Sequence, residues 1–273
     1  MTQAPRTSWD LQAGGPKKII GMVHLDPSPG SPAAGSEPDR IIEMAVDEAR
    51  RLEQAGFDAI ILENMHDAPY VHGDELGPEV VAVMSRALAA VRSAINLHVG
   101  VQVLSGGNRH ALACARVSGG AFVRCENFVF AQVADEGLLA RAEAGALLRY
   151  RRSIGAEQIP VYCDIRKKHA SHAITSDLSL GVIAEGAEFF GADGVIVTGQ
   201  ATGHPTQPND VAAARQGCSL PILIGSGVTP ETIKELFRHA DAAIVGSWIK
   251  ADGQWKNPVD PDRARQMVQA AHG

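Results

Sequence analysis

The sequence predicts a single (β/α)8 TIM barrel, an α/β fold, and three observations support this class. The chain has 273 residues, which suits one barrel domain with some long loops. Eight short apolar runs alternate with helix-like segments, and the runs are apolar almost throughout, as in a parallel sheet covered on both faces. No Gly-x-Gly-x-x-Gly motif follows the first run, which weakens the alternative of an open dinucleotide-binding sheet.

The predicted elements come in regular strand–helix alternation. In the first helix, Ser36 and Asp39 precede apolar residues at helical spacing, and Gly56 ends the helix. Long loops follow the first, second, fourth and fifth strands. We expect strands at residues 17–25, 58–63, 97–103, 121–126, 160–165, 194–198, 221–224 and 242–245. We expect helices at residues 36–55, 79–93, 109–117, 138–154, 178–190, 210–216, 229–238 and 260–271.

The N-terminal segment and the cysteines indicate the cellular compartment of the protein. Residues 1–16 are polar and glycine-rich, so we expect a flexible leader before a barrel domain at 17–273. This leader lacks the apolar core of a signal peptide, and no apolar run is long enough to span a membrane. The four cysteines form no Cys-x-x-Cys pair and are expected to be reduced. The sequence therefore predicts a cytoplasmic protein.

Composition narrows the possible partners. Hydrophobic residues make up 45% and charged residues 21%, as in an ordinary globular protein. The formal net charge of −6 argues against a general nucleic-acid binder, which needs a basic face. We expect the partner to be a small phosphorylated molecule. We also expect a homo-oligomer, because most metabolic enzymes form one.

Two glycine turns near the C-terminus are the most specific feature. Residues 225–227 (Gly-Ser-Gly) follow one buried strand, and Gly246 with Ser247 follows the next. Glycine lets backbone N–H groups approach an anion, and the last two strands of such barrels often hold phosphate. The predicted phosphate-binding residues are Gly199, Gly225, Ser226, Gly227, Gly246 and Ser247.

Polar side chains at the ends of the other strands are the candidates for chemistry, because barrels carry their active sites there. A carboxylate at the end of a buried strand needs a partner or access to the mouth. The predicted catalytic residues are Asp164, Glu63, Glu126, His24 and Lys168. The predicted substrate-binding residues are Asn64, Asn127, Arg166, His169 and Thr198.

Purely structural roles compete with these assignments. Strand alternation points Arg124 and Glu126 into the barrel, where we expect Arg124 to form a structural ion pair. The alternative for Asp164 is an ion pair with Arg166, which shares its strand parity. A Schiff-base role for a lysine requires desolvation, of which the sequence shows no sign for Lys167 or Lys168.

No cofactor is predicted. A divalent metal has suitable ligand types in His24, Glu63, Glu126 and Asp164. No local spacing such as His-x-His or His-Glu-x-x-His supports a metal centre, so acid/base chemistry without a metal is the main prediction.

Four segments together resemble the BtpA/SgcQ family, from about residue 17 to the C-terminus. They are residues 20–32 (IGMVHLDPSPGSP), 58–64 (DAIILEN), 197–203 (VTGQATG) and 224–228 (IGSGV). The resemblance implies a TIM barrel. The family takes its name from a protein needed for photosystem I accumulation, and other members sit among sugar-metabolism genes. It implies no catalytic residues, so the site above depends on the residues themselves.

Three functions follow from these observations. The first is an enzyme that acts on a phosphorylated sugar or a ribosyl or nucleoside-type compound, as a lyase, an isomerase or a glycosidic-bond-cleaving enzyme. The second is a non-catalytic assembly factor for a membrane protein complex of the photosystem I type. The third is a sensor that binds a phosphorylated ligand on a degenerate barrel.

Overall fold

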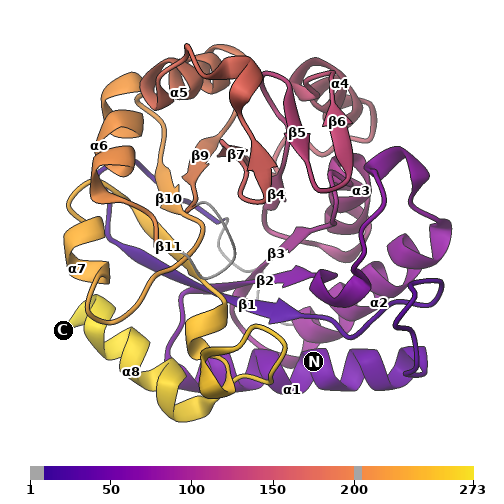
Figure 1. Ribbon diagram of the computed structural model, residues 1–273. Coiled ribbons are helices and arrows are strands. Elements are labelled where there is room, and N and C mark those ends of the chain that lie inside the picture. Colours follow the sequence, from indigo (N-terminus) through magenta and orange to yellow (C-terminus); the bar gives the residue numbers. More distant parts are fainter. Residues whose placement is uncertain (1–8, 200–204) are drawn as a thin grey trace.

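A computed structural model describes residues 9–199 and 205–273, and it confirms the barrel (Figure 1). Eight parallel strands form a closed ring in chain order, with the last pairing back to the first. These strands are β1 (Lys18–His24), β2 (Ala59–Glu63), β3 (His98–Gln102), β4 (Val123–Cys125), β7 (Val161–Ile165), β9 (Gly194–Val197), β10 (Ile222–Ile224) and β11 (Ala242–Val245).

An outer ring of helices covers the strands. The helices are α1 (Pro38–Ala55), α2 (Pro78–Ala94), α3 (Asn108–Ser118), α4 (Ala144–Ser153), α5 (Leu180–Phe189), α6 (Pro208–Gly217), α7 (Ile233–Leu236) and α8 (Pro261–His272). Gly56 takes a left-handed conformation (φ 96°) that ends α1 where the sequence predicts. The α-helix expected at 229–238 is shorter, since only four of its residues are α-helical.

Strand alternation divides the apolar residues into two cores. One core lies between the strands and the helices, and it includes Val23, Leu62 and Val101. The other fills the barrel, where Met22 and Ile61 lie in the same cluster as Phe122 and Tyr162. A barrel filled by side chains is not a pore, so space for a ligand is found at its ends.

The described part of the leader closes the N-terminal end of the barrel. The Trp9 indole stacks on Phe122 with a centroid distance of 5.0 Å, and its Nε1–H donates to the Tyr162 hydroxyl at 2.8 Å. Leu11 is buried in the same cluster. The leader expected at residues 1–16 therefore includes a segment that packs on the barrel.

A small antiparallel sheet that the sequence did not predict lies over the opposite end. It consists of β5 (Gln132–Ala134), β6 (Gly137–Leu139) and β8 (Ala170–Ser171), contributed by the loops after β4 and β7. The helix expected at 138–154 is wrong at its start, because residues 137–139 pair with β5 and α4 begins at Ala144. Two of the long loops are thus ordered against each other above the barrel.

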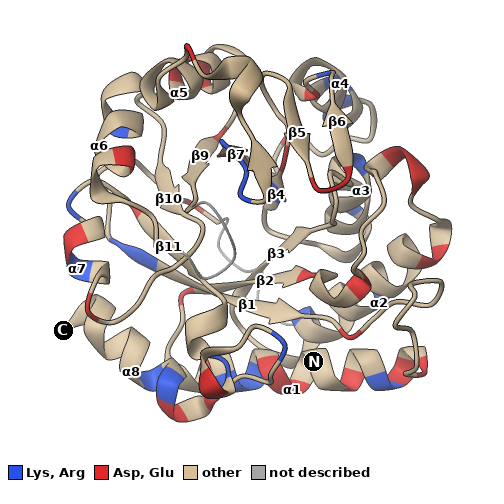
Figure 2. Cartoon of the chain, in the orientation of Figure 1, with Lys and Arg blue, Asp and Glu red and all other residues tan. Residues whose placement is uncertain are grey.

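Charges are spread over the outer helices, with acidic and basic residues interspersed (Figure 2). Among the described residues, no helix is both long enough and apolar enough to cross a membrane.

Candidate active site

Two adjoining cavities lie at the C-terminal ends of the strands. The first is lined by the two glycine turns and by His24, Glu63, Arg124 and Lys168. The second, of about 250 Å³, is lined by residues that include Glu126 and Lys168. Glu63, Met65 and Lys168 line both cavities. The fold thus brings together most of the catalytic and phosphate-binding residues predicted from the sequence.

The glycine turns present backbone donors to the first cavity. No described residue accepts a recorded hydrogen bond from the N–H groups of Gly227, Gly246 or Ser247. Gly227 has φ 65°, a conformation that favours glycine. The N–H of Gly225, by contrast, donates to the carbonyl of Val197 at 2.8 Å. Donors without a protein acceptor at two successive strand ends form a site suited to an anion.

His24 and Glu63 lie next to each other in the wall of this cavity. The Nε2 of His24 lies 3.5 Å from Oε2 of Glu63, and both side chains are 5% exposed. The Nδ1 of His24 is 3.0 Å from the carbonyl oxygen of Trp255, which can only accept. Neutral His24 therefore carries its proton on Nδ1 and presents Nε2 as an acceptor.

Burial sets the protonation of this pair. Desolvation lowers the pKa of His24 well below its usual value, and Lys250 lowers it further. Desolvation also raises the pKa of Glu63, against the charges of Lys168 and Arg124. A neutral carboxyl on Glu63 would donate to Nε2 of His24, so the pair holds a proton that can be given up and regained.

Asp164 forms an ion pair inside the barrel. Its carboxylate accepts two hydrogen bonds from Arg124, Nε to Oδ2 at 3.1 Å and Nη2 to Oδ1 at 3.0 Å. The Asp164 and Arg124 side chains are 1% and 3% exposed. The prediction of a structural ion pair for Arg124 is confirmed. Asp164 pairs with this arginine and not with Arg166, so it holds Arg124 in place beneath the cavity.

The two neighbouring lysines after β7 differ sharply. Lys167 donates to Glu136 at 2.8 Å and lies 3.4 Å from Glu126, and these carboxylates raise its pKa against desolvation. Lys168 has no hydrogen-bond or ion-pair partner among the described residues. Burial, followed by the charge of Arg124, lowers the pKa of Lys168. Its amine therefore gives up its proton more readily than an ordinary lysine amine.

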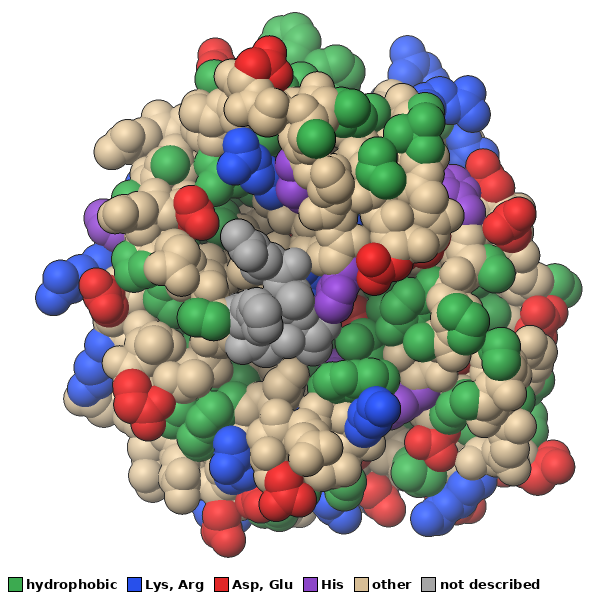
Figure 3. Space-filling view, viewed as in Figure 1, with side chains coloured by type: hydrophobic (Ala, Val, Ile, Leu, Met, Phe, Trp, Pro, Cys, Tyr) green, Lys and Arg blue, Asp and Glu red, His purple; other side chains and the backbone are tan. Residues whose placement is uncertain are grey.

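The sequence did not identify Glu136 as a site residue. It lies in the turn between β5 and β6, where Figure 2 shows acidic residues above the barrel. Its side chain is 4% exposed, and its buried Oε2 has no hydrogen-bond partner among the residues that the structure describes. Figure 3 shows histidine and acidic side chains beside this hairpin at the rim of the mouth. The polar turn of Asp135, Glu136 and Gly137 between short apolar stretches was the signal available for this hairpin.

The second cavity has further polar and aromatic walls. Gln102 at the end of β3 has a buried Oε1 that no residue in the described part of the chain contacts by a hydrogen bond. Tyr70 donates to the carbonyl of Met65 at 2.7 Å, and Trp255 contributes its indole from the loop after β11. His169 lines the same cavity and lies 3.6 Å from Asp135. Of these wall residues, the sequence identified His169 but not the two aromatic residues.

Asn64 and Asn127 hold loops together. Asn64 donates to Asp67 and to the carbonyl of Leu104, and its Oδ1 accepts from the N–H of Leu104 at 2.7 Å. Asn127, with φ 54°, donates to the carbonyl of Arg141 at 2.9 Å. The structure places neither residue among those that line the two mouth cavities.

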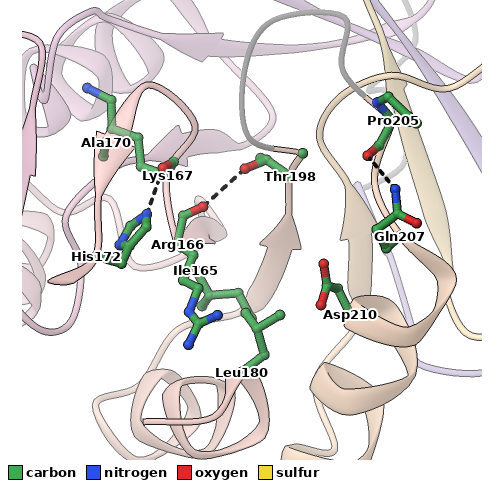
Figure 4. A pocket seen from close by; sticks show the side chains of 11 residues that line it. Ile165, Arg166, Lys167, Ala170, His172, Leu180, Thr198, Pro205, Gln207 and Asp210 are labelled. Atoms are coloured by element: carbon green, nitrogen blue, oxygen red, sulfur yellow. Dashed lines mark hydrogen bonds between the residues drawn. The ribbon is translucent and has the colours of Figure 1, made fainter. Parts of the chain in front are cut away.

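Arg166, Thr198 and Gly199 line a separate cavity of about 770 Å³ between β7 and α6 (Figure 4). Arg166 has φ 57° just after β7 ends, so strand alternation no longer applies and its side chain leaves the barrel. Its Nη2 donates to the carbonyl of Leu178 at 2.6 Å. The N–H of Gly199 donates to Oγ of Ser226 at 2.7 Å. Residues 200–204, which complete the motif containing Gly199, lie outside the described residues.

The possible metal ligands are not arranged as a metal centre. Among the residues described, no group of three or more His, Cys, Asp or Glu side chains is placed to hold an ion. Of the four candidates, Asp164 is bound to Arg124, while His24 and Glu63 face each other.

Comparison with solved structures shows the fold alone. The chain superposes on a 3-hexulose-6-phosphate synthase with a TM-score of 0.57 and 16% identity, covering 93% of this chain and 99% of that one. It superposes equally well on N-(5′-phosphoribosyl)anthranilate isomerase from Pyrococcus furiosus, with a TM-score of 0.57 and 10% identity, over 93% and 98% of the two chains.

Sequence comparison identifies the family. An uncharacterized mitochondrial protein of Caenorhabditis elegans is 40% identical over 92% of this chain and 91% of its own length. The photosystem I biogenesis protein BtpA of Synechocystis is 34% identical, over 92% of this chain and 87% of its own. The model of the BtpA family matches residues 16–273. This chain therefore belongs to the BtpA family.

Proposed function

We propose that this protein is an enzyme that acts on a small phosphorylated sugar or ribosyl compound by acid/base chemistry. One observation carries the proposal. Residues at the ends of β10 and β11, whose backbone N–H groups have no acceptor among the described residues, line the same cavity as the His24–Glu63 pair. A substrate phosphate held at the turns would bring the rest of the molecule close to this proton donor.

The charges of the cavity support an anionic ligand. The N–H groups of Gly227, Gly246 and Ser247 lie with Arg124 and Lys168 around it. The space there is only about 30 Å³, roughly that of one water. A phosphoryl group therefore needs the mouth to widen, and we expect the side chains of the second cavity to move with the ligand.

The His24–Glu63 pair supplies the chemistry in this proposal. Glu63 in its neutral form donates a proton to a substrate oxygen, and His24 accepts a proton from the substrate through Nε2. Glu126 at the adjoining cavity is the second candidate base, because its side chain lies within reach of the same substrate. Isomerisation, elimination and cleavage of a glycosidic bond all use this pair of roles.

Replacing Gly246 tests the proposal with little risk to folding. A Cβ at Gly246 would lie 3.5 Å from Cγ of Met22 and 3.7 Å from Nε2 of His24, in ordinary contact, but within the cavity. We expect Gly246→Ala to weaken binding of inorganic phosphate and ribose 5-phosphate about tenfold or more by calorimetry. Gly35→Ala, which adds a methyl group to an exposed loop, is the control. Equal binding by all three proteins, or none by the wild type, would refute the phosphate site.

A protein-binding role is the second candidate, favoured by an exposed apolar surface on α5. Phe189 and Phe190 are 84% and 53% exposed and stack edge to face at 5.6 Å. Hydrophobic side chains gather over α5 at the upper edge of Figure 3. Exposed aromatic pairs of this kind commonly contact other proteins. Replacing both phenylalanines with serine would abolish such a contact, or a homo-oligomer formed there, and leave phosphate binding unchanged.

The compartment remains a prediction. All four cysteines are free and buried, as we expect of a protein in a reducing compartment such as the cytoplasm.

A further inference from the structure

The surroundings of Lys168 differ from those of the two buried lysines of the described chain, Lys167 and Lys250. Lys167 is held by Glu136 and Glu126, and Lys250 donates to Glu48 at 2.6 Å. Lys168, which lines both mouth cavities, has no comparable partner among the described residues. A lysine that serves only to balance charge would be expected to contact a carboxylate, as the other two do.

The position of Lys168 also suits a reaction with a bound molecule. It lines the first cavity together with the glycine turns and also lines the second. Charged groups face it from three strands: Arg124 from β4, Glu63 from β2 and Asp164 from β7, with Glu126 just beyond β4. A ligand whose phosphate lies at the turns therefore has its carbon skeleton directed toward the amine.

We propose that Nζ of Lys168 forms a Schiff base with the carbonyl carbon of a phosphorylated aldehyde or ketone. This inference rests on the proposed function, because it takes the same phosphate site and names the reactive group of the substrate. It adds the substrate class, an open-chain carbonyl compound, and a covalent role for one residue.

The step balances with the groups at hand. The neutral amine attacks the carbonyl carbon, a C–N bond forms, and the carbonyl oxygen takes a proton from Glu63 to give a carbinolamine. The nitrogen of this adduct, which gained a positive charge in the attack, passes one proton through the Glu63 carboxylate to the hydroxyl oxygen. The freed nitrogen lone pair then forms C=N as the C–O bond breaks, and the oxygen leaves as water. The sum is a neutral amine, a carbonyl and the proton of Glu63 giving a protonated imine, water and the Glu63 carboxylate. The imine then withdraws electrons, so a carboxylate such as Glu126 removes a proton from the adjacent carbon.

The surroundings of Lys168 favour the first of these steps. Burial and the charge of Arg124 lower its pKa, which raises the fraction of neutral amine. Glu63 has a raised pKa, so its proton is available to the developing oxygen. The ion-paired Lys167 lacks these conditions, because its carboxylate partners raise its pKa.

Borohydride trapping tests the inference. The full-length protein is incubated with dihydroxyacetone phosphate or ribulose 5-phosphate, reduced with sodium borohydride, digested and mapped by mass spectrometry. We expect a stable secondary amine on Lys168 and not on Lys167, with less adduct when inorganic phosphate competes. Lys168→Arg keeps the charge but is not nucleophilic, so it should lose the adduct while still binding phosphate. Lys168→Met, of similar length, serves if the arginine variant does not fold.

The outcomes separate the two proposals. Binding of either phosphorylated compound by calorimetry without any adduct on Lys168 would overturn the Schiff base and leave the proposed function standing. Adduct formation that persists in Lys168→Arg, or that inorganic phosphate does not reduce, would also overturn it. If neither compound nor inorganic phosphate binds, the proposed function fails and the inference fails with it.

Discussion

Arg124 on β4 and Asp164 on β7 form a two-point ion pair inside the barrel, 40 residues apart in the chain and almost without exposure. The pair places the Arg124 guanidinium at the floor of the cavity that the glycine turns line. A Cβ at Gly225 would lie 2.6 Å from Cγ2 of Ile196, 2.8 Å from Cγ2 of Thr198 and 3.2 Å from Nη2 of Arg124, so even a methyl group there would crowd this floor.

Breaking this pair should cost stability. We expect Asp164→Ala to lower the free energy of unfolding by about 3–5 kcal/mol, because it leaves a buried guanidinium without its counter-charge. Urea denaturation followed by circular dichroism measures the loss. The matched control is Asp39→Ala, which removes an exposed partner of Arg86 and should cost at most about 1 kcal/mol. Similar losses in the two variants would contradict the role given to Asp164.

The His24–Glu63 pair should make stability depend on pH in two opposite directions. The folded pKa of His24 lies below 6.5, so the unfolded chain binds more protons there and stability is lost as pH falls below about 6.5. The folded pKa of Glu63 lies above 4.5, so the folded chain binds more protons and stability is lost as pH rises above about 4.5.

Two variants separate these contributions. His24→Asn keeps a donor toward the carbonyl of Trp255 and should flatten the loss of stability below pH 6.5. Glu63→Gln should flatten the loss above pH 4.5. Urea denaturation at several pH values measures both slopes, and His239→Asn, at an exposed histidine, is the control. Unchanged slopes in both variants would show that the pair titrates alike in the folded and unfolded chain.

The ion pair between Glu136 and Lys167 should hold the β5–β6 hairpin over the mouth. Glu136→Gln replaces a charged acceptor, and we expect a loss of about 1.5–3 kcal/mol in the local stability of the hairpin. Hydrogen exchange of the amides at residues 132–139 should accelerate correspondingly. Glu185→Gln changes an exposed glutamate on α5 and should leave exchange of the hairpin as it is. If the hairpin amides of Glu136→Gln exchange as slowly as those of the wild type, the pairing with β8 alone holds the hairpin in place.

Trp9 should stabilise the other end of the barrel. Trp9→Ala removes the indole stacked on Phe122 and leaves the Tyr162 hydroxyl without its donor, so we expect a loss of about 3 kcal/mol. Trp9→Phe keeps an aromatic ring there and should lose only about 1 kcal/mol, the contribution of the hydrogen bond. Chemical denaturation distinguishes them, and wild-type stability of Trp9→Ala would show that this segment adds nothing to the fold.

Sequence patterns located most of the barrel because they report local physical preferences. The apolar runs at Asp58–Glu63 and Ala242–Val245 became β2 and β11 within one residue at each end. Because the strands were predicted correctly, their polar ends were too. The fold brings His24, Glu63, Lys168 and the glycine turns to the same mouth. The segment at 138–154 was assigned wrongly at its start because a strand with only three residues has too short a period to recognise.

The amino-acid sequence by itself determined the fold class, the family and the strand ends where chemistry could lie, since these depend on periodicity and turn residues over short stretches. Only the tertiary structure decided which charges are neutralised and which are not. It joined Asp164 to Arg124, bound Lys167 to Glu136 and left Lys168 between two cavities. The physical reason is that these ion pairs join residues far apart in the chain. Their partners depend on how the barrel closes and on how the loops fold, and short stretches of sequence do not specify either.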